Sequence, residues 1–391
     1  MLTPPFGRAI RHEWLLEEGL DFLNHGSFGA TPRVVLAAQD RWRLAMERQP
    51  MRFFLEEYGG ALRGAAARLA AYVGAEPEDL AFVDNATTGV NAVLRSLALA
   101  PGDELLTTEH VYNAVGLTLD YVAERAGARV VRFALPYPVR GPDDLLAGLT
   151  SALTDRTRIV VLDHVTSATA MLLPIGPAVA LCRQRGVPVL IDGAHALGML
   201  PLDLPALGAD WYTGNAHKWL CAAKGTAFLW CRPDAPDRAA LRPTVVSHPY
   251  RQGLAEEFDW TGTRDPSAWL AIDAALTFRE GLGDERVRAW NNGLAAAAAD
   301  LLARAWGVDL PVPAAMRGSM ACVPCPVDVS PDAAGVQRLA RWLRETHQLE
   351  PMPVPFDGRM YIRVSAQVYN SIDQYERLAD VLLRSPFPSA S

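Results

Sequence analysis

The residue types best suited to covalent chemistry follow two predicted strands. The chain has 35 arginines but only two lysines, Lys218 and Lys224. Arginine stays protonated in proteins, whereas lysine can lose its proton and act as a nucleophile or base. Lys218 follows the strand-like run 211–212, and Asp192 ends the apolar run Val189-Leu-Ile-Asp192. Successive parallel strands are thus predicted to bring a carboxylate and an amine to one sheet edge. Lys224 is expected to be a solvated loop residue or a structural charge.

A third motif could hold an anion. The sequence Asn85-Ala-Thr87-Thr88-Gly89 runs from a predicted strand into a predicted helix. The hydroxyls of Thr87 and Thr88 and the free N–H groups of the first helical turn favour a phosphate, and the helix dipole adds to that preference. Taken alone, the same motif is equally well explained as a helix cap made by Asn85 or Thr87.

Together, the amine, the carboxylate and the anion site match the needs of pyridoxal 5′-phosphate (PLP). The lysine would form an aldimine with the aldehyde of the cofactor. The carboxylate would keep the ring nitrogen protonated, so that the ring accepts the electrons released when a bond at an amino acid's Cα breaks. Nicotinamide and P-loop sites are excluded, because the chain has neither a GxGxxG after its first strand nor a Gly-x4-Gly-Lys-Ser/Thr motif.

These motifs require a sheet that positions them. Short apolar runs alternate with helix-like segments, a pattern that predicts an α/β fold with a mostly parallel, doubly wound sheet covered on both faces. Ligands of such sheets lie beyond the carboxyl ends of the strands. The predicted strands are 80–83, 104–107, 129–133, 158–165, 187–191, 211–212 and 226–230, and the predicted helices include 61–73, 89–99, 114–126 and 177–185.

The pattern changes near residue 256 and predicts a smaller α+β domain. The predicted elements are a long helical region over 267–306, proline-rich strands within 311–329, a helix over 333–346 and a strand over 360–365. The stretch Pro351-Met-Pro-Val-Pro355 is expected to be an exposed, stiff connection. We therefore expect an N-terminal arm (1–20), a large PLP-binding domain (21–260) and a small C-terminal domain (261–391).

Composition narrows the class of protein. Half of the 391 residues are hydrophobic, and the formal net charge is −7. No apolar run approaches the ~18–20 residues of a membrane span, and the negative charge disfavours a nucleic-acid partner. Five cysteines without an export signal favour the cytoplasm. The lone pair in Cys322-Val-Pro-Cys325 predicts a structural strand, and no metal site is expected.

Four segments carry a resemblance to a known family. They are Leu23-Asn24-His25-Gly26-Ser27-Phe28-Gly29, Asn85-Ala-Thr-Thr-Gly-Val-Asn91, Asp192-Gly-Ala-His195 and His217-Lys218. They resemble the class V branch of the fold-type I PLP enzymes. Within that branch the chain is most similar to the isopenicillin N epimerase-like group, which also includes carbon–sulfur lyases such as those of ergothioneine biosynthesis. The resemblance spans residues 20–370 and implies a fold-type I PLP-transferase, an amino-acid substrate and a homodimer.

The resemblance also assigns the cofactor contacts. It implies that Lys218 holds the cofactor, that Asp192 pairs with the ring nitrogen, and that His110 stacks on the ring, with Tyr112 as the competing candidate. The other polar contacts that it implies are His195 and Ser167 near the ring hydroxyl, and Thr87, Thr88, Asn215, His217 and Thr263 at the phosphate. Thr263 would reach that phosphate from a partner subunit.

On the substrate side, the resemblance assigns the carboxylate to Arg363, whose planar guanidinium suits a bidentate contact. Asn24 and His25 would lie beside the substrate. Class V desulfurases carry a nucleophilic cysteine shortly before this arginine, but residues 347–360 contain none. Desulfuration through a persulfide is therefore disfavoured.

Three reactions of the PLP enzymes remain open. In epimerisation, which we expect first, Lys218 takes the Cα proton and the resulting quinonoid is reprotonated on its opposite face. That step needs a second acid, which Tyr112 or the Asn24-His25 loop could supply. In a C–S (β-elimination) lyase the same carbanion expels a β-sulfur group, and aminotransfer uses the same residues. A PLP-binding protein without catalysis is the last alternative.

Overall fold

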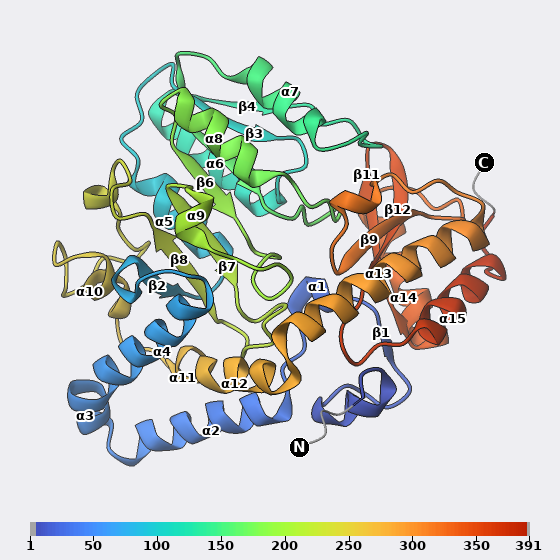
Figure 1. Cartoon of the computed structure of the whole chain (residues 1–391), viewed down its shortest axis with the longest axis horizontal. Coiled ribbons are helices and arrows are strands. Elements are labelled where there is room, and N and C mark those ends of the chain that lie inside the picture. The colour runs from blue at the N-terminus through green and yellow to red at the C-terminus, as the bar shows by residue number, and fades with distance from the viewer. Residues whose placement is uncertain (1–4, 389–391) are drawn as a thin grey trace.

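The larger sheet has seven strands within residues 5–388, the part of the chain that the computed structural model describes. Their order is β2-β8-β7-β6-β5-β3-β4 (Figure 1). β8 runs antiparallel to β2 and β7, and the other neighbouring pairs are parallel, so the predicted mostly parallel sheet is confirmed. The strands are β2 (Leu80–Val83), β3 (Glu104–Thr108), β4 (Arg129–Phe133), β5 (Thr157–Asp163), β6 (Val189–Asp192), β7 (Trp211–Asn215) and β8 (Ala227–Cys231).

Successive residues of a strand point to opposite faces of this sheet, and each face carries its own apolar core. In β2, Leu80 and Phe82 belong to one core, whereas Ala81 and Val83 belong to the other. Both faces are therefore buried, which explains why the strands are almost continuously apolar. The first core also contains side chains of α4 (Tyr58–Tyr72), α7 (Asp143–Ala152) and α8 (Ile175–Gln184), and the second those of α5 (Ala86–Ser96) and α6 (Asn113–Ala126).

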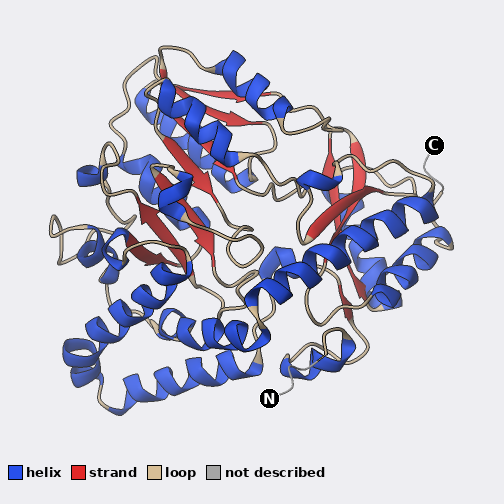
Figure 2. Ribbon diagram, in the orientation of Figure 1, coloured by secondary structure: helices blue, strands red, loops and turns tan. Residues whose placement is uncertain are grey.

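A second, antiparallel sheet in the order β11-β12-β9 supports the C-terminal part of the chain (Figure 2). Its strands are β9 (Met320–Pro324), β11 (Met352–Phe356) and β12 (Arg359–Ser365). A separate apolar core joins it to α13 (Asp284–Trp306), α14 (Ala333–His347) and α15 (Ile372–Leu383). The two-residue strands β1 (Asp21–Phe22) and β10 (Leu349–Glu350) pair in parallel beside it. α1 (His25–Phe28) lies between the two sheets (Figure 1).

Three predictions for the C-terminal part were wrong in detail. The expected long helix is three helices, α11 (Ser267–Leu270), α12 (Ile272–Leu282) and α13, because Ala271 and Gly283 interrupt it, the latter with a φ of +80°. Of the strands expected within 311–329 only β9 forms. The stretch 351–355 is mostly strand β11, an edge strand, where proline costs no ladder hydrogen bond on its outer side. Cys322 and Cys325 are buried and free, at β9 and just beyond it.

The domain boundary at residues 260 and 261 stays a prediction. α11 and α12 follow it in sequence but pack against α2 (Arg33–Arg48) and α4. The N-terminal segment contacts the other end of the chain, because Gly7 N–H donates to the Val368 carbonyl at 2.7 Å. Residues 1–4 of the expected arm and 389–391 of the expected small domain lie outside the described residues.

The short helices α3 (Pro50–Arg52), α9 (Leu204–Leu207) and α10 (Leu254–Asp259) complete the fold. Within residues 5–388 no helix combines the length and apolarity needed to cross a bilayer.

Candidate active site

The carboxyl ends of the central parallel strands open on a cavity of about 710 Å³. Asp192 is the last residue of β6 and Asp163 is the last residue of β5, and the two are partners in the strand register. Leu190 and Val161, two positions earlier in each strand, lie in the core shared with α5 and α6, so strand alternation turns both carboxylates toward that layer. Both are only 3% exposed and both line the cavity.

Asp163 was missed by the sequence analysis. The signal was present, because Val160-Val-Leu-Asp163 is an apolar strand that ends in an aspartate, like the run that ends at Asp192. Only the register of the two strands shows that the two carboxylates are neighbours.

Lys218 lies in the loop after β7, and its Nζ is 3.2 Å from Nε2 of His195. Burial and the nearby Arg363 lower the pKa of Lys218 to about 8, against the opposing effect of Asp192. An amine with such a pKa is partly neutral near physiological pH, as a nucleophile or general base requires. Lys218, Asp192 and His195 therefore come together at the cavity, as the sequence predicted.

His195 is held as a neutral imidazole. Burial and Lys218 keep its pKa well below the usual range. Trp219 donates its indole N–H to Nδ1 of His195 at 3.4 Å, and Nε2 of the same ring faces Lys218.

The start of α5 forms part of the cavity wall, as expected of an anion site. Thr87 lines the cavity, but Thr88 does not. Asn85 Oδ1 accepts hydrogen bonds from the Thr88 N–H at 2.9 Å and from the Thr88 hydroxyl at 3.2 Å. Asn85 is therefore the helix cap, and the Thr88 hydroxyl donates its hydrogen bond to this cap. The helix cap is thus confirmed, and the anion site stays a prediction.

Asn215 and His217 also line the cavity. Asn215 Oδ1 accepts the Ala86 N–H at 2.8 Å, which ties the end of β7 to the start of α5. His217 Nδ1 donates to the Thr226 carbonyl at 3.1 Å, and burial lowers the pKa of His217 to about 4. Thr263 is exposed and does not line the cavity of its own chain.

His110 and Tyr112, the two candidates for ring stacking, lie in different surroundings. The His110 ring stacks on Phe356 of β11, with centroids 4.4 Å apart, and its nitrogens bond Thr169 Oγ1 and the Leu135 carbonyl. It is buried between the two sheets and does not line the cavity. Tyr112 is 43% exposed and lines the cavity, so of the two rings it is that of Tyr112 that the structure places at the cavity.

Arg363 of β12 is a buried cation. Its guanidinium donates to the Ser167 carbonyl, to Ser27 Oγ at 2.8 Å and to Asn24 Oδ1 at 3.2 Å, and within residues 5–388 it pairs with no carboxylate. Ser27 and Ser167 line the cavity, so Arg363 lies one contact behind its wall. A buried guanidinium without a counter-ion suits a substrate that brings a carboxylate.

His25 does not reach the cavity, contrary to its predicted place beside the substrate. It is fully buried, donates from Nε2 to the Lys218 carbonyl at 2.9 Å and accepts the Tyr369 hydroxyl at Nδ1 at 2.7 Å. Gly29, four residues after His25, lies so close to the backbone of His217 that a Cβ there would be 2.0 Å from the His217 carbonyl oxygen. Gly29 and His25 therefore position the Lys218 loop, and Asn24 positions Arg363.

Lys224 is exposed in a loop, as expected, and it also lines the cavity. Its Nζ donates to Thr31 Oγ1 at 3.1 Å. Burial lowers its pKa. Both lysines of the chain therefore face the same cavity.

The residues at this cavity fit PLP. Lys218 would hold the aldehyde, Asp192 the ring nitrogen, and Thr87, the first turn of α5 and His217 the phosphate. Asp163 Oδ2 is completely buried and has no hydrogen-bond partner within the described chain, as expected of a site that a ligand completes.

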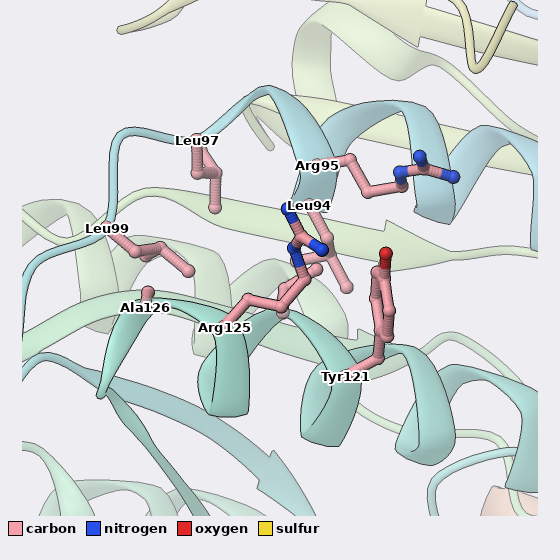
Figure 3. A pocket seen from close by; sticks show the side chains of 8 residues that line it. Leu94, Arg95, Leu97, Leu99, Tyr121, Arg125 and Ala126 are labelled. Carbon is pink, nitrogen blue, oxygen red and sulfur yellow. The ribbon is translucent and has the colours of Figure 1, made fainter.

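Another hollow, of about 360 Å³, lies between α5 and α6 (Figure 3). The guanidinium carbons of Arg95 and Arg125 are 6.0 and 5.6 Å from the ring centre of Tyr121 there. Its lining contains neither a lysine nor a carboxylate, and none of the predicted site residues. The chemistry therefore belongs to the cavity at the strand ends.

The chain is similar to known proteins over most of its length. Residues 30–378 match the family model described as aminotransferase class-V. The isopenicillin N epimerase of Amycolatopsis lactamdurans is 36% identical over 394 residues, covering 95% of this chain and 96% of that protein. The L-cysteine desulfhydrase of Arabidopsis thaliana is 31% identical over 401 residues, covering 94% and 88%. A solved complex of the cystine C–S lyase C-DES with cysteine persulfide superposes with a TM-score of 0.79 at 23% identity, covering 95% of this chain and 98% of that one. The chain belongs to the class V aminotransferase family and is an enzyme whose cofactor is PLP.

Proposed function

We propose that the enzyme is an epimerase or racemase of an amino-acid substrate. One observation supports this proposal: the strands that lead to two acid–base residues flank the carboxylate pair in the sheet order. In the sheet order β7-β6-β5-β3, β6 and β5 end in Asp192 and Asp163, whereas Lys218 follows β7 and Tyr112 follows β3. Inversion at Cα needs a base on one face of the substrate and an acid on the other.

Each residue of the cavity then has a task. PLP, when bound, accepts the electron pair left at Cα after the proton departs. Lys218 takes that proton, since its pKa of about 8 leaves part of the amine neutral near pH 7. Arg363, behind Ser27 and Ser167, holds the substrate carboxylate and so fixes which bond at Cα faces Lys218. The Tyr112 hydroxyl returns a proton from the other flank.

A C–S (β-elimination) lyase is the second candidate, favoured by the names of relatives such as the L-cysteine desulfhydrase of Arabidopsis thaliana. Elimination uses Lys218 for the Cα proton and needs no second acid on the opposite face. Desulfuration through a persulfide on an enzyme cysteine receives no support, because the five cysteines are buried and none lines the cavity. Aminotransfer is a third alternative, and no observation favours it over the first two.

The test is incubation of the PLP-loaded enzyme in D2O with a panel of L-amino acids and cysteine conjugates. Deuterium at Cα with inverted configuration supports the epimerase. Pyruvate with a released thiol or sulfide supports the lyase, and a keto acid with bleached cofactor supports the aminotransferase. Tyr112→Phe is the matched variant: an epimerase should lose inversion while it still exchanges the Cα proton. Full inversion in Tyr112→Phe would contradict the role of this hydroxyl.

We further propose a cytoplasmic homodimer. Thr263 lies exposed outside the cavity of its own chain, as a residue that serves the partner's phosphate would. The five free cysteines suit a reducing compartment. Light scattering on the purified protein tests the dimer, and Thr263→Ala should weaken PLP binding if the contact exists.

A further inference from the structure

We propose that Arg279 is a positioning residue for the PLP site: its buried guanidinium holds the two loops that carry Lys218 and His195 in a fixed relative position. Arg279 belongs to α12 and does not line the cavity. The proposal rests on the proposed role of Lys218 as the residue that binds PLP. It is the same whether the enzyme epimerises its substrate or eliminates a sulfur group.

The loops after β6 and β7, which carry His195 and Lys218, contact each other directly. Trp219 donates its indole N–H to His195 Nδ1 at 3.4 Å, and His195 Nε2 is 3.2 Å from Lys218 Nζ. Gly198 has a φ of +83°, and a Cβ there would lie 2.7 Å from the carbonyl carbon of Trp219. The backbones of the two loops are therefore packed together with no room for a side chain between them.

The guanidinium of Arg279 joins these two backbones. Nη1 donates to the Trp219 carbonyl, one residue after Lys218, at 2.6 Å. Nη2 donates to the Gly198 carbonyl, three residues after His195. A guanidinium is planar and presents its donors in a fixed fork, so it sets the separation of the two carbonyls. Arg279 thereby fixes where the two loops present their side chains to the cavity.

Arg279 is itself held by the start of α13. Its Nε donates to Asp284 Oδ1, and the same oxygen accepts the Tyr72 hydroxyl at 2.8 Å. Arg288, one turn later in α13, pairs with the other oxygen of Asp284. All three nitrogens of the Arg279 guanidinium are thus engaged, and each has a different acceptor, so the side chain is fixed in one orientation.

Stability alone is a poor explanation for this buried cation. Arg279 is only 3% exposed. Removing a guanidinium from water is costly, and well-packed apolar residues of similar volume often stabilise a protein core as well as a buried ion pair does. Two of the three acceptors of Arg279 belong to the loops of the cavity. Its contacts therefore match a positioning role.

The test measures how fast Lys218 becomes linked to PLP after the cofactor-free protein is mixed with saturating PLP. In this step Lys218 Nζ bonds the aldehyde carbon, and the aldehyde oxygen leaves as water with the two amine protons. Borohydride quenching at successive times, followed by mass spectrometry of the reduced peptide, gives the rate. Arg279→Met should link about 100-fold more slowly than the wild type, the scale of a 1 Å misplacement. Arg279→Lys keeps the charge but not the planar fork, and its rate should lie between the two.

Arg63→Met is the matched control. Arg63 also donates to two carbonyls and one carboxylate, those of Pro77, Leu80 and Asp259. Leu80 begins β2, at the end of the sheet opposite the cavity. Arg63→Met should therefore lower the melting temperature and still link PLP at the wild-type rate. If a methionine variant does not fold, Arg279→Lys and Arg63→Lys repeat the comparison. A wild-type rate at position 279, or equal slowing at both positions, would overturn the proposal.

Hydrogen–deuterium exchange of the cofactor-free proteins tests the positioning independently of PLP and of the reaction. The Cys221 N–H donates to the Lys218 carbonyl at 3.0 Å and reports on that loop. In Arg279→Met, exchange should be faster in peptides that span 196–200 and 218–222 and unchanged in β3 and β4. Unchanged exchange in the two loops, or faster exchange throughout the chain, would overturn the proposal.

The linking experiment also separates this proposal from the role of Lys218. A wild-type label on Lys224 would overturn the role of Lys218 and this proposal together. A wild-type label on Lys218, with an unchanged rate in Arg279→Met, would overturn this proposal alone.

Discussion

Replacing Arg363 with methionine should selectively weaken the binding of molecules that carry a carboxylate. Arg363 is 4% exposed, and its guanidinium pairs with no carboxylate within residues 5–388. A substrate carboxylate bound there would form a buried, charge-assisted pair. Removing one partner of such a pair costs about 2–5 kcal/mol. Since about 1.4 kcal/mol corresponds to a factor of ten, the dissociation constant of an amino acid should rise roughly 30- to 4,000-fold.

The assay is a titration of the PLP absorbance with L-alanine and, separately, with ethylamine, which lacks only the carboxylate. The wild type should prefer alanine, and Arg363→Met should lose that preference while its affinity for ethylamine stays within about threefold. Arg363→Lys keeps the charge but not the planar fork, and should recover only part of the preference.

Two outcomes would refute this reasoning. An equal loss of affinity for ethylamine would mean that Arg363 acts only by supporting Asn24, Ser27 and the Ser167 carbonyl. An unchanged affinity for alanine would mean that the carboxylate binds elsewhere in the cavity.

Two further predictions concern the segment that supports the Lys218 loop. Burial lowers the pKa of His25 to about 3, so between pH 6.5 and 3 the unfolded chain binds a proton that the folded protein excludes. The free energy of unfolding should therefore decrease as the pH is lowered through that window, and it should decrease less steeply in His25→Gln. Urea titrations at several pH values measure both dependences, and an equal dependence on pH in the two proteins would contradict this. Gly29→Ala should abolish PLP binding, because φ is +70° and the new Cβ would collide with the His217 carbonyl. Gly59→Ala, whose Cβ meets nothing within 4 Å in α4, should instead stabilise the protein by ~1 kcal/mol in thermal unfolding.

The large sheet could be predicted because strands that are buried on both faces are nearly continuous apolar runs in the sequence. The bounds of β2 and β4 agree with the prediction to the residue. The C-terminal part was less predictable. Neither the break at Ala271 nor the edge position that accommodates Pro353 in β11 has a local signal.

The cavity likewise combines features that have a local signal in the sequence with features that have none. Lys218, Asp192 and His195 stand at strand ends, and parallel topology alone brings them together. The sequence could not distinguish the surroundings of His110 from those of Tyr112. The His110 ring stacks on Phe356, a residue of the second sheet that is far away in the sequence. Asp163 becomes significant only through its register with β6.

Lys218, and not Lys224, should form the covalent link to PLP. Both lysines line the cavity, so Lys224 is an alternative site of attachment for the cofactor. Borohydride reduction of the PLP-loaded protein, followed by tandem mass spectrometry, should place the reduced cofactor on Lys218 alone, and Lys218→Ala should carry none. A label on Lys224, or one that persists in Lys218→Ala, would contradict the account.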